Sequence, residues 1–259
     1  MPSGDDLNTY HRLLGDLFDR ADRVVAFTGA GISTESGIPD FRSPGGLWTK
    51  RRIIDYDEFI ASPQARLEDW QRRFEMEDQL GAVAPNVGHY ALANLVEAGK
   101  ITHVVTQNVD ALHQRSGIPD DKVIELHGNS TYAKCLTCGL VHTIAAIRAE
   151  IERKPEAPAC VSCGGIVKSA VISFGEQMPQ EAMLRAQRAA LGADLFLAIG
   201  SSLVVYPAAG IPLMAKQNGA ELLILNRDPT ELDSYADYVV NRSIGEVLSP
   251  FAKPENRQN

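Results

Sequence analysis

Four short apolar runs that each end in small or amide-bearing residues set the strongest limit on how this chain can fold. The segments between them have the periodicity of helices. Strands that alternate with helices predict an α/β fold with a parallel, doubly wound sheet, whose ligands bind beyond the carboxyl ends of the strands. The expected strands are Val24–Phe27, Ile101–Thr106, Leu195–Ile199 and Leu222–Leu225, and the expected helices are Leu7–Arg20, Asn86–Ala98, Pro179–Leu191 and Ala208–Gln217.

Two insertions are predicted to interrupt this sheet. Residues 44–84 are rich in charged and aromatic side chains and indicate a helical module, whereas residues 129–168 carry all the cysteines of the chain. The sheet domain would then comprise residues 1–43, 85–128 and 169–259. Because ligand sites often lie where domains meet, we expect a cleft at the border between the sheet and the insertions.

The four cysteines form two C-x-x-C pairs, Cys135 with Cys138 and Cys160 with Cys163. Each pair can bind one edge of a tetrahedral zinc ion from a tight turn. Two disulfides, or one redox-active pair, are the alternatives. Disulfides need an oxidising compartment, and Met1–Tyr10 lacks the basic and apolar pattern of a signal peptide. We therefore expect one bound Zn²⁺ and a cytoplasmic location.

The four-cysteine ligand set also indicates what the zinc does. A catalytic zinc keeps one position open for water or substrate, whereas four thiolates close the site. The zinc is therefore expected to be structural, and the chemistry to lie elsewhere.

The charge of the chain narrows the range of partners. A net charge of −8 argues against a general affinity for nucleic acid.

Residues 195–215 contain no charged side chain and approach the length of a membrane span. Gly200, Pro207, Gly210 and Pro212 interrupt this run, which is more typical of a buried strand, a loop and a helix. No membrane span is expected.

A glycine-rich segment follows the first strand. In Gly29–Ser33, backbone N–H groups can approach a pyrophosphate because no Cβ stands in the way at the glycines, although an ordinary tight turn is the alternative. The chain continues to Asp40, Phe41 and Arg42, which could bind an amide, shield a ring and face a phosphate. A surface loop with an ion pair between Asp40 and Arg42 would give the same pattern.

Amide and carboxylate side chains follow the second strand. Gln107, Asn108 and Asp110 suit ribose hydroxyls and a carboxamide. Helix capping by Asn108 or Asp110 is an alternative that could hold at the same time. His113, which ends this segment, is expected to be structural.

A histidine and a glycine follow the apolar segment Val123–Leu126. His127 is a candidate general base because the ordinary pKa of imidazole lies near physiological pH, and Gly128 permits close approach. The alternative is a histidine that is merely hydrogen-bonded in the core. His89, within an expected helix, is a candidate of this structural kind.

Eight motifs in a fixed order resemble the sirtuin family of NAD-dependent protein lysine deacylases. They are GAGIS, GIPDFR, TQNVDALH, ELHG, the two C-x-x-C pairs, VISFGEQMP, GSSLVVYPAA and LILN, and they span nearly the whole chain. The resemblance implies a Rossmann-like NAD-binding domain, a small zinc-binding domain and a helical module. NAD and acyl-lysine would meet in the cleft between them.

The resemblance also implies which residues bind NAD. Ile32, through its backbone, and Asp110 would hold the nicotinamide carboxamide, while Phe41 would shield the ribose carbon that loses nicotinamide. Gln107 and Asn108 would orient the ribose and a water. The implied cofactor-binding residues are Gly29, Ala30, Gly31, Ile32, Ser33, Asp40, Phe41, Arg42, Trp48, Gln107, Asn108, Val109, Asp110, Gly200, Ser201, Ser202, Asn226 and Ile244.

The implied reaction begins when the acyl oxygen of an acyl-lysine attacks C1′ of the ribose and nicotinamide leaves. His127 then accepts a proton from the ribose hydroxyls so that the 2′-oxygen can attack the resulting intermediate, and water finally releases O-acyl-ADP-ribose and free lysine. His127 and Asn108 would be the catalytic residues, and the peptide would add as a strand. The implied substrate-binding residues are Val171, Phe174, Gly175 and Glu176.

The chain departs from the family pattern at two places. Lys168-Ser169-Ala170 stands where many members have Lys/Arg-Pro-Asp, which affects the expected peptide preference. Trp70 and Arg73 align with the Tyr-x-x-Arg pair of members that remove succinyl or malonyl groups. Because the tyrosine is absent, we expect an uncharged acyl group, above all acetyl.

Other functions remain open at this point. Removal of lipoyl or succinyl groups and mono-ADP-ribosyl transfer would use the same NAD cleavage. A zinc-ribbon binding module is the alternative that is not an enzyme, but it predicts basic and aromatic residues around the cysteines, and residues 129–168 have mixed charge and a single aromatic, Tyr132. The expected partners are acyl-lysine proteins or peptides, with no direct contact to nucleic acid, and the chain is expected to be a monomer.

Overall fold

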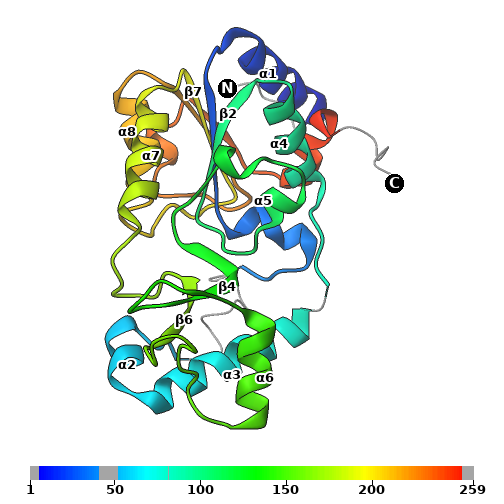
Figure 1. The fold of residues 1–259 in the computed structure, drawn as a ribbon. Helices are drawn as coiled ribbons and strands as arrows, with labels where there is room; N and C mark the ends of the chain where they lie inside the picture. Colours follow the sequence, from blue (N-terminus) through cyan, green and yellow to red (C-terminus); the bar gives the residue numbers. More distant parts are fainter. Residues whose placement is uncertain (1–5, 41–51, 81, 253–259) are drawn as a thin grey trace.

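The computed structural model of the protein describes residues 6–40, 52–80 and 82–252. A larger lobe contains the main sheet, and a smaller lobe lies below it in the view of Figure 1. The chain passes between the lobes at several points, and one of them directly follows His127.

The main sheet has six strands in the order β3-β2-β1-β7-β8-β9, and all neighbouring strands are parallel. This is the strand order of doubly wound dinucleotide-binding folds, in which the order reverses at the central strand. The reversal lies between β1 and β7. The strands are β1 (Val24–Thr28), β2 (Ile101–Thr106), β3 (Val123–Glu125), β7 (Leu195–Ile199), β8 (Glu221–Leu225) and β9 (Tyr238–Val240).

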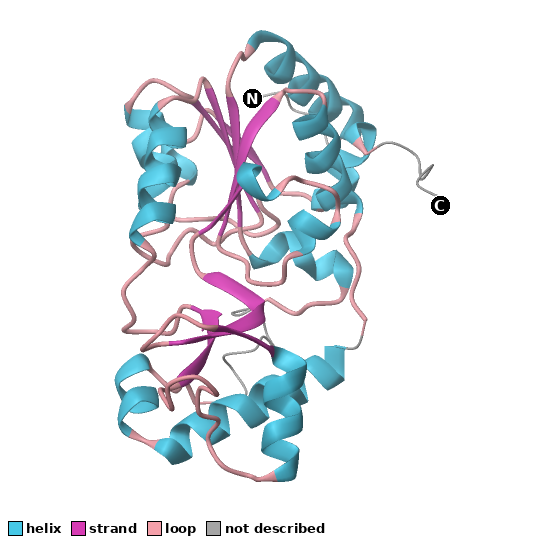
Figure 2. Ribbon diagram, in the orientation of Figure 1, coloured by secondary structure: helices cyan, strands magenta, loops and turns pink. Residues whose placement is uncertain are grey.

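Helices cover both faces of this sheet, as Figure 2 shows. Val24 and Ala26 of β1 face α1 (Leu7–Arg20), α4 (Val87–Glu97) and α9 (Ile244–Leu248). Val25 and Phe27 face α7 (Gln180–Leu191) and α8 (Gly210–Gln217) on the opposite side. Successive side chains of a strand point to opposite faces, so an uninterrupted apolar run is what a strand buried on both faces requires.

The expected strands and helices are confirmed, with ends that shift by a few residues. The uncharged run of residues 195–215 forms β7, a loop and the first part of α8. Within the described residues, no helix combines the length and the apolar character that a membrane crossing needs. The remaining short elements of the larger lobe are η1 (Ala30–Ser36), α5 (Leu112–Arg115), η3 (Asp120–Lys122), η4 (Asp233–Tyr235) and η5 (Ser249–Phe251).

The smaller lobe combines both predicted insertions around one core. Trp70 and Phe74 of the helical segment pack with Cys135, Cys160 and other residues of the cysteine-bearing segment. The indole Nε1 of Trp70 also donates a hydrogen bond to the carbonyl of Val167 at 3.4 Å. The sequence positions at which the predicted domains begin and end remain predictions. The elements are α2 (Tyr56–Ala61), α3 (Pro63–Leu80), α6 (Ile144–Arg153), and an antiparallel sheet of β5 (Val141–Thr143), β4 (Gly128–Cys135) and β6 (Val167–Val171).

Gly128 allows β4 and β6 of the smaller lobe to pair closely beside His127. Its φ is +77°, and a Cβ at this position would lie 1.9 Å from the carbonyl oxygen of Ala170. Only glycine fits such a left-handed, crowded position. The backbone N–H of Ile172 donates to the carbonyl of His127 at 2.9 Å. The backbone on both sides of the His127 imidazole is therefore held tightly.

Candidate active site and metal centre

Two glycine segments lie against each other where the strand order reverses. Gly29 N–H donates to Ile199 O at 3.1 Å, and Gly31 N–H donates to Gly200 O at 2.8 Å. A Cβ on Gly31 would lie 2.7 Å from the Cα of Gly200, so a larger residue would push the segments apart. The fold thus brings Gly29–Ser33 and Gly200–Ser202, both predicted to bind phosphates, to the position where doubly wound folds bind dinucleotides.

A hydrogen-bonded group of polar side chains lies beside the glycine segments. Ser33 Oγ donates to Asp110 Oδ2 at 2.7 Å. Asn108 Nδ2 donates to Gly29 O at 3.0 Å and contacts Ser33 Oγ at 3.2 Å. Asp110 Oδ1 accepts from the N–H of Leu112, the first residue of α5, at 2.9 Å, and the N-cap residue of this helix is Ala111. The structure therefore brings together the side chains predicted to surround nicotinamide.

His127 is oriented by the neighbouring strand end. Its Nδ1 lies 3.0 Å from the carbonyl oxygen of Gln107, which can only accept a hydrogen bond. Nδ1 therefore carries the proton, and Nε2 holds the lone pair. Burial lowers the pKa of His127 below its ordinary value, and the bond to the Gln107 carbonyl opposes this shift. The imidazole is accordingly neutral at pH 7, which is the form that a general base requires.

Gln107 links His127 to the second glycine segment. Its backbone N–H donates to Thr28 O at 2.9 Å, and its side-chain Nε2 donates to Ser201 Oγ at 2.8 Å. Val109, two residues further on, is held by Ser130, whose N–H and Oγ both donate to the Val109 carbonyl at 2.8 and 2.7 Å. The whole segment after β2 is thus fixed by contacts to β1, β4 and the loop after β7.

The residues predicted to bind the adenosine half lie further along the same edge of the sheet. Asn226 directly follows β8, and its Nδ2 donates to Asp228 O at 2.7 Å. Ile244 packs against the backbone of Gly200 and Gly88. Glu35, which the sequence analysis did not identify, accepts from Gly245 N–H and Ser243 Oγ, each at 2.9 Å. No local pattern marks Glu35, because its partners lie more than 200 residues away.

Some predicted site residues are not placed by these contacts. Phe41, Arg42 and Trp48 lie outside the described residues. Asp40, at the end of the described part of its loop, is half-buried, and Ala30 is half-buried as well. Ser202 is exposed.

Trp70 and Arg73, which the sequence alignment associates with acyl selectivity, have different environments. Trp70 is 0 % exposed and stacks on Phe74 with ring centroids 5.7 Å apart, so its side chain does not line an open pocket. Arg73 is partly exposed, and its guanidinium lies 5.8 Å from the Trp70 ring centroid. Burial lowers the pKa of Arg73, which Asp69 and Glu77 partly offset.

A buried ion pair shapes the predicted peptide-binding segment. Lys168 Nζ lies 2.8 Å from Glu176 Oε2, with side chains only 4 % and 16 % exposed. Lys168 Nζ also donates to the Val171 carbonyl, and Glu176 Oε2 accepts from Ser173 N–H at 2.8 Å. The carbonyl of Phe174 already accepts from Tyr56 N–H at 2.8 Å. The backbone of Tyr56 thus already pairs with one residue of the predicted peptide-binding segment.

Replacing Lys168 by methionine should lower the free energy of unfolding by about 3 kcal/mol, because the Glu176 carboxylate stays buried without its cation. The KM for an acyl peptide should rise, since the ion pair between Lys168 and Glu176 fixes the conformation of residues 171–176. The double variant Lys168→Met/Glu176→Gln removes both charges and should be less destabilised than Lys168→Met alone. Urea unfolding and peptide titration measure the two effects. A double variant as unstable as the sum of the single variants would contradict this role.

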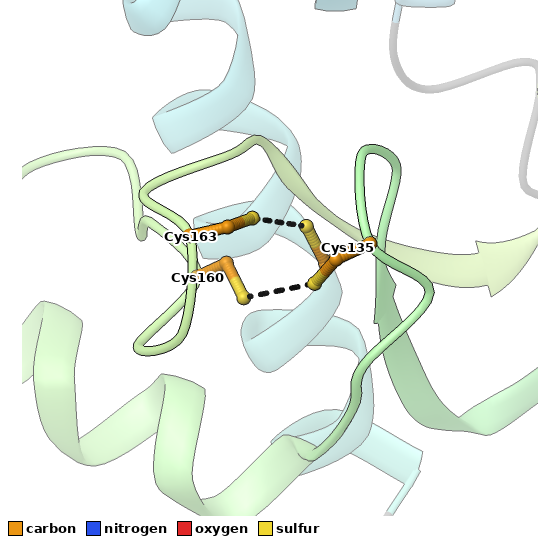
Figure 3. Close-up of side chains that lie close together, drawn as sticks. Cys135, Cys160 and Cys163 are labelled. Atoms are coloured by element: carbon orange, nitrogen blue, oxygen red, sulfur yellow. Dashed lines mark hydrogen bonds between the residues drawn. The ribbon is translucent and has the colours of Figure 1, made fainter.

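The four cysteines form a metal centre at the far end of β4. All four Sγ atoms lie within 4.8 Å of one another. The Sγ atoms of Cys135 and Cys163 are 3.5 Å apart (Figure 3). Those of Cys138 and Cys160 are 3.7 Å apart. Four thiolates at about 2.3 Å from one zinc ion would be about 3.8 Å apart, whereas a disulfide requires about 2.05 Å. The arrangement fits one tetrahedral zinc ion and contains no disulfide.

The metal centre is remote from the candidate active site. Cys135 is the last residue of β4, whose first residue, Gly128, follows His127. The length of this strand places the cysteines on the order of 20 Å from the imidazole. Because the four-thiolate site is also closed, the zinc holds the smaller lobe together and does not contact substrate.

Comparison with known proteins identifies the family. A family model described as "Sir2 family" matches residues 29–207. This chain belongs to the Sir2 family. The predicted resemblance to the sirtuins is thereby confirmed.

Similar proteins extend over nearly the whole of this Sir2 chain. It is 54 % identical to "NAD-dependent protein deacetylase" of Rhodopseudomonas palustris, covering 92 % of this chain and 94 % of the relative. It is also 54 % identical to "NAD-dependent protein deacetylase 1" of Bradyrhizobium diazoefficiens, covering 95 % and 96 %. A solved structure described as "Sir2-p53 peptide-NAD+" has a TM-score of 0.81 and 35 % identity, covering 92 % of this chain and 95 % of that one.

Proposed function

We propose that this chain is an NAD-dependent protein lysine deacetylase that releases nicotinamide and O-acetyl-ADP-ribose. The observation that carries the proposal is the position of His127. Its Nδ1 is bound to the carbonyl of Gln107, which leaves Nε2 as the basic nitrogen, and Gln107 directly precedes Asn108, whose side chain contacts Ser33. Two relatives at 54 % identity are named deacetylases, and one neighbouring structure contains 2′-O-acetyl-ADP-ribose with a deacetylated peptide.

In the proposed mechanism, bound NAD supplies the ribose carbon to which the acyl oxygen bonds when nicotinamide leaves. The Ile32 backbone and Asp110 orient the carboxamide, and Asn108 orients the ribose. Once nicotinamide has left, His127 Nε2 accepts a proton from a ribose hydroxyl. The phosphates would lie beside Gly29–Ser33, where no Cβ blocks their approach at the glycines.

The individual roles of the cofactor-binding residues are part of this proposal, including those of Phe41, Arg42 and Trp48. The same holds for a peptide that pairs with Phe174, Gly175 and Glu176. A cytoplasmic location, a monomeric state and the absence of nucleic-acid binding also remain predictions.

The acyl group that we expect is acetyl. Selection of a carboxylate-bearing acyl chain would need a polar side chain next to Arg73, and the aligned residue, Trp70, is fully buried in the core. Small uncharged groups should therefore be accepted best. One neighbouring Sir2 structure contains a propionylated peptide, which is consistent with some tolerance of chain length.

A panel of acetyl, butyryl, succinyl and lipoyl peptides, compared by kcat/KM with NAD, tests the proposal. We expect the acetyl peptide to have the highest value, with one nicotinamide and one O-acetyl-ADP-ribose formed per lysine released. Reactions without NAD are the control. ADP-ribosylated protein without O-acetyl-ADP-ribose would instead indicate ADP-ribosyl transfer. If NAD neither raised the thermal midpoint nor supported any deacylation, the chain would be a binding module.

A further inference from the structure

Two buried histidines lie behind the predicted nicotinamide site, and the proposed mechanism does not use them. His89 of α4 is 0 % exposed and His113 of α5 is 1 % exposed. Their rings are in contact, with centroids 5.1 Å apart at an angle of 56°. A buried polar side chain needs hydrogen-bond partners to offset its desolvation, so the partners of these rings indicate what they hold in place.

His113 is connected to Asn108 by a chain of three hydrogen bonds. His113 Nε2 lies 2.8 Å from Thr28 Oγ1, and Thr28 Oγ1 donates to Thr106 Oγ1 at 2.8 Å. Thr106 Oγ1 in turn accepts from the backbone N–H of Asn108 at 3.0 Å. Because the single proton of the Thr28 hydroxyl is used on Thr106, its oxygen accepts the proton of His113 Nε2.

This assignment also accounts for the other ring nitrogen of His113. Nδ1 is buried without a partner among the described residues. With the proton on Nε2, Nδ1 has only a lone pair, and no N–H is left unsatisfied. Burial lowers the pKa of His113 well below its ordinary value, and the neighbouring His89 lowers it further. The neutral ring is thus the stable form.

His89 supports the opposite side of the same site. Its Nδ1 lies 3.1 Å from Asn86 Oδ1, and Asn86 Nδ2 donates to Ile32 O at 2.7 Å. Burial lowers the pKa of His89 to about 4, so this ring is neutral as well. The two rings in contact therefore connect to both sides of the predicted nicotinamide site, His89 to Ile32 and His113 to Asn108.

We propose that His113 is a positioning residue for NAD cleavage, acting through Thr28 and Thr106 to hold the Asn108 backbone in place. The inference rests on the proposed function, because it assigns Asn108 to the nicotinamide ribose. Asn108 follows the end of β2, and no hydrogen bond of the sheet itself holds its N–H. The Thr106 hydroxyl replaces that bond, and His113 fixes the hydroxyl through Thr28.

Three variants test this role. His113→Leu keeps an apolar side chain against His89 but removes the Nε2–H group that donates to Thr28. His113→Gln restores an N–H at about the reach of Nε2, and Thr28→Val removes the acceptor from the other side. The readouts are kcat for deacetylation, the inhibition constant of nicotinamide, the Kd of ADP-ribose and the thermal midpoint. ADP-ribose lacks nicotinamide, so its Kd reports on the phosphate and adenosine sites alone.

We expect His113→Leu and Thr28→Val each to lower kcat about tenfold, the effect of losing one buried hydrogen bond. The inhibition constant of nicotinamide should rise, while the Kd of ADP-ribose should change by less than about twofold. His113→Gln should recover most of the activity. The double variant should lose no more kcat than the less active of the two single variants, since both changes break the bond between His113 and Thr28.

Other outcomes would overturn the inference in distinct ways. If the wild-type chain deacetylates but His113→Leu and Thr28→Val have unchanged kcat and nicotinamide inhibition, His113 has no positioning role. If ADP-ribose binding and the thermal midpoint fall in parallel with kcat and glutamine does not rescue, His113 only stabilises the fold. If the wild-type chain shows no NAD-dependent deacetylation, the proposed function itself fails. Thr28→Val keeps the test valid if His113→Leu does not fold.

Discussion

Replacing His127 by tyrosine or alanine should lower kcat for NAD-dependent deacetylation by about a thousandfold, the usual contribution of a positioned general base. Without Nε2, no group at this position accepts the proton of the ribose hydroxyl. The fold should remain intact, because the His127 side chain is only half-buried and its hydrogen bond within the described part of the chain is to the Gln107 carbonyl. Steady-state kinetics and circular dichroism measure the two effects.

Nicotinamide exchange provides the matched readout for this prediction. In the proposed mechanism His127 acts after nicotinamide has left, so exchange of labelled nicotinamide into NAD should fall much less than deacetylation. Equal loss of both activities would place His127 in the first step. A His127→Ala variant with more than about a tenth of the wild-type kcat would show that another group is the base.

The pH dependence of the wild-type chain follows from the same geometry. The neutral form of His127 is active, so activity is present above its pKa and is lost as the pH falls through that value. Burial lowers this pKa from its ordinary value of 6.5. The acidic limb of the kcat profile should therefore lie below pH 6.5. An acidic limb centred above pH 7 would contradict the assignment of His127 as the base.

Removing the zinc ion should abolish activity by unfolding the smaller lobe. Structural zinc contributes on the order of 10 kcal/mol to the folding of small zinc modules, and Cys135 and Cys160 belong to the core that holds this lobe together. Chelation should lower the thermal midpoint, and added Zn²⁺ should restore both midpoint and activity. Cys135→Ala should have the same effect as chelation.

Trp70 is an internal reporter for this experiment. The chain has two tryptophans, and Trp70 packs in the same core as Cys135 and Cys160. In a Trp48→Phe background, the fluorescence of Trp70 should shift to longer wavelength when zinc is removed. In the wild-type chain, which keeps the proposed cofactor-binding residue Trp48, ADP-ribose binding should be retained after zinc removal, because the glycine segments belong to the sheet of the larger lobe. A Cys135→Ala variant that stayed folded and fully active would contradict the structural role of the zinc.

Several elements were predictable nearly to the residue. The strand predicted at Val24–Phe27 is Val24–Thr28 in the structure, and the helix predicted at Leu7–Arg20 has the same bounds. These elements have uninterrupted apolar runs or several turns of amphipathic pattern. β9 and α9 were not predicted, because elements of three and five residues are too short to establish a period.

The candidate site was predictable in its composition but not in its contacts. The segments around Gly29, Asn108 and Gly200 could be located because each follows an apolar strand, and parallel strands bring their carboxyl ends to one edge. The shared core of α3 and the cysteine segment was not predictable. Trp70 meets Val167 across 97 positions of sequence, and no local pattern encodes such a pairing.

The order of the motifs, the parallel sheet and the cysteine spacing that fits zinc could all be inferred from sequence, because each depends on residues close together in the chain. Tertiary structure alone decided which side chains meet. The contact between His113 and Thr28 spans 85 positions, and that between Glu35 and Gly245 spans 210. Such partners are chosen by the packing of whole strands and helices, since hydrogen bonds need atoms within about 3 Å of one another. The sequence predicted only a structural role for His113. The packing of the folded chain is the basis for the proposal that it supports the active site.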